Sequence, residues 1–327
     1  MEPRDVIVVG GSAGCLGPLR GFVADLPADM PGSVAVTVHI GERSLLPEIL
    51  SRSGPLPATH ASQDEALRPS RIYVAPPGRH LLMPGGIVDL SNGPRMNRTR
   101  PAVDAMFGSA ARWAGDRLVA VVLSGGLDDG AVGAALVAQA GGLVVVQDPD
   151  EADYPSMPRA ALAAASGAIS VPTAKLAEVV VGMLGERGLA DWPHPEQEDT
   201  PEMTMDESGD LQFLSAGEAR LTRLACPECG GALAEGVLPR ITYYRCHVGH
   251  QFSPQALVAA QAESAEAKLW AAVAGLEETA ALARHLAEHA PVAGAVERQT
   301  RTADWAADLA GSVRNQFEAS PDSIGET

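Results

Sequence analysis

The chain has 327 residues, and 46% of them are hydrophobic, enough to bury a large core beside a second, smaller domain. The 24 Lys and Arg residues against 41 Asp and Glu residues give a net charge of −17, which repels nucleic-acid phosphates and anionic lipid head groups. No apolar run approaches the roughly 20 residues of a membrane-spanning helix, and Glu2, Arg4 and Asp5 disrupt a secretory signal. We therefore expect a cytoplasmic protein that binds no nucleic acid and does not insert into a membrane.

Residues 5 to about 190 alternate short β-branched runs with longer stretches rich in alanine and leucine. This alternation is typical of repeated βα units around a mostly parallel sheet. We expect strands at 6–9, 34–39, 71–75, 118–123 and 143–147, and a hairpin formed by 80–83 and 86–90. The predicted fold class is α/β, with a doubly wound sheet.

The turn GGSAG, residues 10–14, follows the first predicted strand. It does not match a dinucleotide fingerprint, because Val9 stands where the first glycine is needed, and it lacks the lysine of a P-loop. Two interpretations remain open on this motif alone. Gly10, Ser12 and Gly14 fit G-x-S-x-G, a sharp turn that exposes a nucleophilic serine, but the serine of such a turn also caps helices.

Two further residues follow strands in the same way. His39 ends the second predicted strand, and Asp129 lies in SGGLDDG after the strand 118–123. Each has an ordinary alternative, a surface histidine or a turn aspartate. However, the carboxyl ends of parallel strands meet at one edge of a sheet, so Ser12, His39 and Asp129 are expected to converge there as nucleophile, base and acid. Their chain order differs from that of an ordinary α/β-hydrolase, whose histidine comes last.

Five blocks of sequence, in this order, carry a family resemblance over about residues 5–185. They are VGGSAGCLGPLRGFVADLPADMPGSVAVTVHI, LRPSRIYVAPPGRHLLM, RPAVDAMFGSAA, VVLSGGLDDGAVGA and GGLVVVQDPDEADYPSMPRAAL. In these blocks the chain resembles the catalytic domain of CheB-type chemotaxis protein-glutamate methylesterases. The resemblance implies a parallel sheet with helices on both faces. It also implies a serine hydrolase that demethylates γ-glutamyl methyl esters on the cytoplasmic helices of chemoreceptors and deamidates receptor glutamines, without a cofactor for catalysis.

Carried over by position, the resemblance implies that Ser12 is the nucleophile, His39 the general base and Asp129 the residue that orients His39. A backbone N–H at Gly126 is expected to bind the oxyanion, although this chain has Gly125, Gly126 and Leu127 where the family has Gly-Met-Gly, so that Gly126 stands at the position of the methionine. Asp128 is assigned no catalytic role. With the nucleophile at position 12, we expect a chain without a built-in receiver domain. A non-catalytic signalling or scaffold module on the same fold, and an esterase for a non-chemotaxis protein, remain alternatives.

A cysteine-bearing segment follows an acidic, proline-containing stretch that is typical of a flexible linker. It carries Cys226-x2-Cys229 and Cys246-x3-His250, whose spacing favours a structural zinc ion held by three thiolates and one imidazole. His247 is a competing ligand. His250, at the end of the x3 spacing from Cys246, is preferred because the adjacent residues Cys246 and His247 of a strand would face opposite ways. The segment resembles a small zinc ribbon. Cys15, far from this cluster, is expected to be a small buried hydrophobic residue.

The last part of the chain has helical periodicity. One pattern runs from 254 to 290 and the other carries an apolar stripe of Trp305, Leu309, Val313 and Phe317, with Pro291 between them. These observations predict a helical hairpin packed against itself. The predicted segments are a catalytic domain at 1–190, an acidic linker at 191–218, a zinc-ribbon-like segment at 219–255 and a helical hairpin at 256–320.

Overall fold

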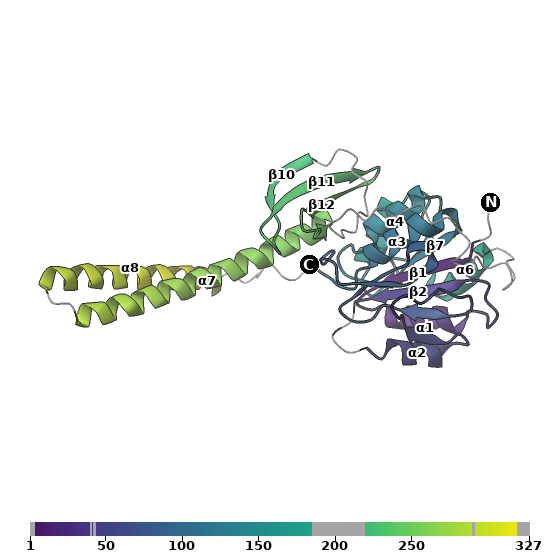
Figure 1. Ribbon diagram of the computed structural model, residues 1–327, viewed down its shortest axis with the longest axis horizontal. Coiled ribbons are helices and arrows are strands. Elements are labelled where there is room, and N and C mark those ends of the chain that lie inside the picture. Colours follow the sequence, from purple (N-terminus) through teal and green to yellow (C-terminus); the bar gives the residue numbers. More distant parts are fainter. Residues whose placement is uncertain (1–3, 40, 42–43, 185–219, 290–291, 319–327) are drawn as a thin grey trace. The chain divides into compact units, whose positions relative to one another are not determined.

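The computed structural model describes residues 4–39, 41, 44–184, 220–289 and 292–318 (Figure 1). Its two compact units comprise residues 1–257 and 258–327. The predicted acidic linker at 191–218 lies outside the described residues.

The first unit contains a sheet of seven parallel strands in the order β3-β4-β2-β1-β7-β8-β9. The strands are β1 (Val6–Gly11), β2 (Ser33–Val38), β3 (Ala58–His60), β4 (Ile72–Val74), β7 (Leu118–Val122), β8 (Leu143–Gln147) and β9 (Ile169–Val171). Strand order reverses between β1 and β7, so the sheet is doubly wound and the α/β prediction is confirmed. Strands β3 and β9, which have three residues each and form the two edges of the sheet, were not predicted.

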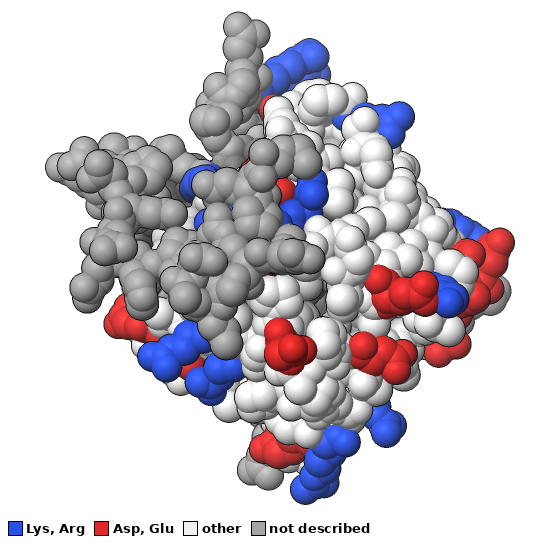
Figure 2. Space-filling model, turned by 90° about the vertical axis from the view of Figure 1, so that its right-hand side faces the viewer, with Lys and Arg blue, Asp and Glu red and all other residues white. Residues whose placement is uncertain are grey.

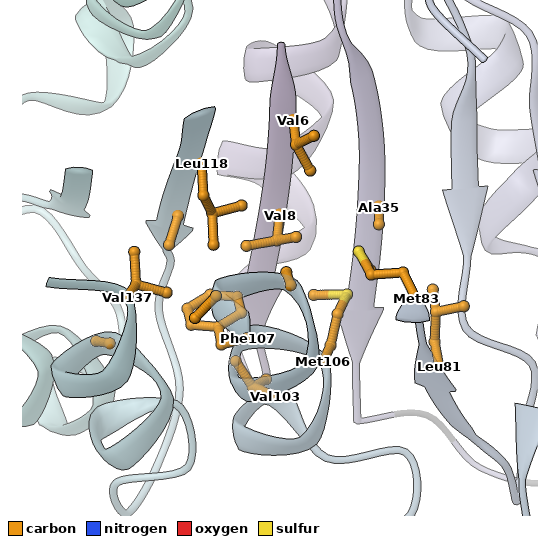
Figure 3. Close-up of a cluster of buried hydrophobic side chains, with 14 of the residues drawn as sticks. Val6, Val8, Ala35, Leu81, Met83, Val103, Met106, Phe107, Leu118 and Val137 are labelled. Carbon is orange, nitrogen blue, oxygen red and sulfur yellow. The ribbon is translucent and has the colours of Figure 1, made fainter. Parts of the chain in front are cut away.

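Helices cover both faces of this sheet, as the family resemblance implies. One face packs against α1 (Leu16–Ala24), α2 (Leu46–Ser53) and α6 (Leu176–Met183), and the other against α3 (Val103–Ala114), α4 (Ala131–Gln139) and α5 (Ser156–Ala164). Alternate residues of β1 enter opposite cores, as the period of a strand requires. Val6 and Val8 of β1 belong to the same buried cluster as Met106 and Phe107 of α3 (Figure 3).

Short elements complete the α/β part of the unit. Strands β5 (His80–Leu82) and β6 (Asp89–Ser91) pair antiparallel around the 3-10 turn η1 (Pro84–Gly86), which confirms the predicted hairpin after β4. Two further 3-10 turns, η2 (Gly115–Arg117) and η3 (Thr173–Lys175), precede β7 and α6.

A small antiparallel sheet belongs to the same unit. Its strands are β10 (Arg220–Ala225), β11 (Ala232–Leu238), β12 (Ile241–Cys246) and β13 (Gln251–Phe252). We call residues 220–253 the ribbon. The β11–β12 turn brings Leu238 and Ile241 against a cluster of alanines at Ala131, Ala135 and Ala164. The ribbon therefore packs on α4 and α5, and its boundary as a separate domain stays a prediction.

The second unit is formed by α7 (Pro254–Glu288), from residue 258 onward, and α8 (Ala293–Glu318). The helices pair through Trp270 against the edge of Phe317, with ring centroids 5.7 Å apart, and through an ion pair between Glu277 and Arg314. This confirms the helical hairpin, whereas Pro291 lies outside the described residues. Trp305 and Leu309 are exposed, so the predicted apolar stripe is wrong at these positions. The buried positions of α8 are instead small residues that let two helices approach closely, Ala303, Ala306 and Ala310.

The surface carries charges of both signs. On the face shown in Figure 2, Lys and Arg side chains lie interspersed with Asp and Glu among uncharged residues. The negative net charge is therefore not gathered into one patch on that face. Within the described part of the chain, none of the helices has the length and apolarity needed to cross a bilayer.

Candidate active site

The GGSAG turn places Ser12 directly after the central strand β1, beside the point where strand order reverses. Its backbone N–H donates to Ser124 O over 2.9 Å, which ties it to the end of β7. Gly10 allows α3 to approach this strand, because a Cβ there would lie 2.2 Å from Val103 Cγ1. Gly14 has a φ of +74°, in the left-handed region that favours glycine. The glycines are thus needed for the turn and its packing.

The three residues predicted to converge do so in one chain of hydrogen bonds. Ser12 Oγ lies 3.1 Å from His39 Nδ1, and His39 Nε2 lies 2.7 Å from Asp129 Oδ2. The His39 side chain is 18% exposed and that of Asp129 only 3%. Helix α1 has no side-chain cap, so the interpretation of Ser12 as a helix cap is wrong. The chain of contacts has the order that a nucleophile, a base and an orienting acid require.

Asp129 accepts hydrogen bonds from three groups besides His39. The backbone N–H of Val103 donates to Oδ2 over 2.7 Å, and Oδ1 accepts from the N–H of Asp104 at 3.1 Å and from Asn97 Nδ2 at 3.0 Å. Burial by itself raises the pKa of Asp129, but the His39 interactions and the Asn97 and Val103 hydrogen bonds outweigh it and lower the pKa. Asp129 is therefore held ionised at the N-terminus of α3.

Asp104 is a second buried carboxylate that accepts backbone hydrogen bonds at the start of a helix. It lies in the first turn of α3, and its Oδ1 accepts from the N–H groups of Gly130 and Gly133 at the start of α4, over 2.9 and 2.7 Å. Burial and the charge of Asp129 raise the pKa of Asp104 well above its usual range. Neither Asn97 nor Asp104 was among the predicted site residues. Asp104 stands in the quoted block RPAVDAMFGSAA, whereas nothing in the sequence singles out Asn97.

The loop after β7 carries the remaining predicted residues. The Gly125 N–H donates to Tyr154 O over 2.9 Å, so it is already used. Gly126 follows, and a Cβ at this position would meet nothing within 4 Å. Asp128 is buried and accepts a hydrogen bond from Ser253 Oγ of the ribbon. Burial, together with the charge of Asp129, raises the pKa of Asp128 despite that hydrogen bond.

The four predicted metal ligands converge in the ribbon. Their ligand atoms all lie within 4.8 Å of one another, in a cluster of Cys226, Cys229, Cys246 and His250. Cys229 Sγ lies 3.6 Å from Cys246 Sγ, which lies 3.5 Å from His250 Nδ1. Tetrahedral zinc, with bonds of about 2.3 Å to sulfur and 2.0 Å to nitrogen, separates such atoms by about 3.5–3.8 Å, so the residues fit this ion. His247 instead lies beside Gly231.

Cys15 lies next to the serine turn and outside the cluster. It is buried, and this burial raises the pKa of its thiol to about 11. Because the thiolate is the reactive form of cysteine, the raised pKa disfavours reaction of Cys15 at neutral pH. This agrees with its predicted role as a small hydrophobic residue.

Comparison with known proteins assigns the family. A family model described as CheB methylesterase matches residues 7–180. The chain belongs to the CheB methylesterase family. A solved CheB structure, the methylesterase catalytic domain from Thermotoga maritima, matches with a TM-score of 0.53 and 27% identity, covering 56% of this chain and all of that one. The CheB fold thus accounts for the seven-stranded sheet and its helices.

Two relatives extend the comparison of this CheB chain. A protein of Leptospira interrogans is 34% identical over 180 residues, covering 54% of this chain and 93% of its own length. Protein-glutamate methylesterase/protein-glutamine glutaminase 4 of Anaeromyxobacter dehalogenans is 35% identical over 190 residues, covering 56% of this chain and 53% of that protein. The chain therefore matches about half the length of the Anaeromyxobacter relative.

Proposed function

We propose that the chain is a protein-glutamate methylesterase with a protein-glutamine glutaminase side activity, using Ser12 as nucleophile, His39 as general base and Asp129 as the acid that orients His39. The observation that carries this proposal is the continuous chain of hydrogen bonds from Ser12 Oγ through both ring nitrogens of His39 to Asp129. The name of the Anaeromyxobacter relative and the CheB family support the same activity. A module that only binds partners has no need of this arrangement.

The geometry supports ordinary acyl transfer. Asp129, held ionised, keeps the proton of His39 on Nε2, so Nδ1 presents its lone pair to the hydroxyl of Ser12. Ser12 Oγ attacks the γ-carbonyl carbon of the substrate while its proton passes to His39. His39 then protonates the leaving methoxide, or the leaving amine of a glutamine, and methanol or ammonia departs. Water, deprotonated by His39, attacks the glutamyl-enzyme, which releases the glutamate carboxyl and restores Ser12.

The oxyanion of the tetrahedral intermediate requires hydrogen-bond donors beside Ser12. The N–H of Gly125 already donates to Tyr154 O, so the N–H of the next residue, Gly126, is the proposed donor. Because it is a backbone group, it can donate without the methionine side chain of the family. Open space around Gly126 Cα leaves room for substrate. One such donor contributes about 3–4 kcal/mol to the transition state.

The proposed substrates are methylated glutamates on chemoreceptor cytoplasmic helices or on another methylated signalling protein. We test this by measuring methanol release from a methylated receptor fragment with the wild-type chain, Ser12→Ala and the matched control Ser62→Ala, a change at an exposed serine. Ser12→Ala should lower the rate at least about 10⁴-fold, while the control stays near the wild-type rate. Equal rates for Ser12→Ala and wild type would contradict the serine mechanism.

A fluorophosphonate probe for activated serines separates the alternatives. If the wild-type chain releases no methanol but Ser12 is labelled, the enzyme acts on another ester and the receptor is the wrong substrate. If Ser12 is not labelled either, the chain is a non-catalytic module on the esterase fold.

The ribbon cluster is proposed to hold one structural zinc ion. Three thiolates and one imidazole would fill all four positions of a tetrahedral ion, leaving none for an activated water. The ion would contribute roughly 10 kcal/mol to folding of the ribbon. Zinc content measured by elemental analysis should be one ion per chain, lost in Cys226→Ser and retained in the control Cys15→Ser. Equal zinc in both variants would contradict the assignment.

A further inference from the structure

Asn97 lies in a tight two-residue turn between the β5–β6 hairpin and α3. Met96 and Thr99 exchange backbone hydrogen bonds of 3.2 and 2.9 Å across the turn, and Asn97 and Arg98 have φ values of +49° and +69°. Such a turn requires left-handed backbone at both central positions, which asparagine adopts more readily than most residues. The turn directs the Asn97 side chain to the acid of the proposed triad.

Asn97 is 3% exposed, and both amide hydrogens and the carbonyl oxygen of its side chain take part in hydrogen bonds. Its two amide hydrogens serve two carboxylates, since Nδ2 donates to Asp104 Oδ2 at 2.6 Å and to Asp129 Oδ1 at 3.0 Å. Its Oδ1 accepts from the N–H of Ser253 at 2.9 Å. Asn97 is therefore a neutral donor between two buried acids, and it favours the ionised form of Asp129 beside Asp104.

The far side of Asn97 is held by residues 251–253 at the end of the ribbon. The Asn97 N–H donates to Gln251 O at 2.8 Å, and the Gln251 N–H donates to Arg95 O at 3.4 Å. Ser253 binds Asn97 through its N–H and Asp128 through its hydroxyl, and both Gln251 and Ser253 are buried. Residue 251 directly follows His250, a member of the cysteine–histidine cluster. A short path of contacts thus links that cluster to Asp129.

We propose that Asn97 is a positioning residue for ester hydrolysis and that ribbon residues 251–253 hold it against Asp129. The inference rests on the proposed function, because it assigns a support to the acid of that mechanism. The imidazole of His39 becomes positively charged in the transition state, so a fixed and ionised Asp129 stabilises that state more than the bound substrate. Loss of the support should therefore lower kcat and leave KM unchanged.

The first test compares Asn97→Asp with Asn97→Gly in the full chain. Both residues tolerate positive φ, so the turn itself is preserved. Asn97→Gly removes the donor and should lower kcat about tenfold, the equivalent of one hydrogen bond to a charged group. Asn97→Asp keeps the size and the acceptor for Ser253 but places a third carboxylate beside two others. It should lower kcat about 100-fold, whereas the matched change Asn92→Asp, at an exposed position, should not lower it.

A purely structural role for Asn97 predicts the reverse order, with the isosteric aspartate milder than glycine. Labelling of Ser12 by the fluorophosphonate gives a second readout that does not depend on the natural substrate. Labelling should slow by the same factors as kcat. Equal labelling of wild type and Asn97→Asp overturns the positioning role, as does a wild-type chain that neither releases methanol nor is labelled at Ser12. If labelling slows but no variant releases methanol, the receptor assignment fails and the positioning role stands.

The second test isolates the contact from the ribbon. Ser253→Ala and Ser253→Pro both remove the hydroxyl, but only proline also removes the N–H that binds Asn97 Oδ1. Ser253→Pro should therefore lower kcat several-fold more than Ser253→Ala. Because the extra loss in Ser253→Pro acts through the Asn97 side chain, whereas both variants lose the hydroxyl bond to Asp128, the double variant Asn97→Gly/Ser253→Pro should be no slower than Asn97→Gly/Ser253→Ala. Additive losses would show that residue 253 does not act through Asn97 and would overturn the role of the ribbon.

Discussion

The two ends of the hydrogen-bonded chain from Ser12 to Asp129 are built in different ways. Ser12 is partly exposed, and it is placed by a turn of small residues and by backbone hydrogen bonds with Ser124 and Cys15. Asp129 is buried and accepts four hydrogen bonds, from His39, Asn97, Val103 and Asp104.

The difference follows from what each group must reach. A nucleophile must touch substrate, so shape and close packing position it while its oxygen stays accessible. An orienting acid never touches substrate, so it can be enclosed by donors that fix its charge and its direction. The serine side should therefore be sensitive to added volume, and the acid side to lost or misplaced hydrogen-bond donors.

The largest effect is expected for Asp129→Asn on the acid side. The NH2 group of the new amide faces groups that donate hydrogen bonds to Asp129. When it donates to His39 Nε2, the imidazole proton must lie on Nδ1, the nitrogen that faces Ser12, where it blocks the lone pair needed by the base. With the wrong tautomer, kcat should fall roughly 10⁴-fold. Mispaired buried donors should also lower the free energy of unfolding by about 2–4 kcal/mol. Methanol release and urea unfolding measure the two losses.

The control for this variant is Asp150→Asn, because the Asp150 side chain is 92% exposed. It should change stability by no more than about 0.5 kcal/mol and leave kcat unchanged. A stable, active Asp129→Asn enzyme would mean that the four hydrogen bonds do not position the acid.

A smaller effect is expected from Gly10→Ala on the serine side. The added Cβ would lie 2.2 Å from Val103 Cγ1, so β1 and α3 must separate, at a cost of about 1–3 kcal/mol. Hydrogen exchange of the β1 amides should report this loss. Gly21→Ala in α1 is the matched control, because its Cβ would meet nothing within 4 Å and alanine favours a helix by about 0.5–1 kcal/mol. Similar exchange in both variants would show that close packing at Gly10 is unimportant.

The same contrast explains what could be predicted from the sequence. Ser12, His39 and Asp129 were predictable because each follows a buried strand, and the carboxyl ends of parallel strands meet. The cysteine–histidine cluster was predictable because its spacing is local. Asn97 was not, because its role depends on a turn, two acids and a ribbon segment that only the folded chain brings together.

The predictions of the edge strands and of the helical hairpin interface were incomplete for related reasons. Strands β3 and β9 have three residues each, too few for a period to emerge. In α8, Phe317 of the predicted apolar stripe packs against Trp270, but Trp305 and Leu309 are exposed and the buried positions are alanines. Local patterns thus gave the elements and the residues that follow them, while contacts between distant segments determined how the acid is held.

The smallest effect concerns the pH dependence of stability on the acid side. Burial raises the pKa of Asp128, so the folded chain keeps its proton over a window that begins near the ordinary carboxylate value of about 3.9 and extends upward. In that window the folded state binds more protons than the unfolded state, and stability falls as pH rises. Asp128→Asn removes this pH-dependent contribution to stability, while the oxygen of the new amide can still accept the hydrogen bond from Ser253. The variant should therefore gain stability relative to wild type as pH rises through the window, with no such gain below it. A difference in urea midpoint that does not change with pH would mean that Asp128 is ionised as readily in the folded chain as in the unfolded one.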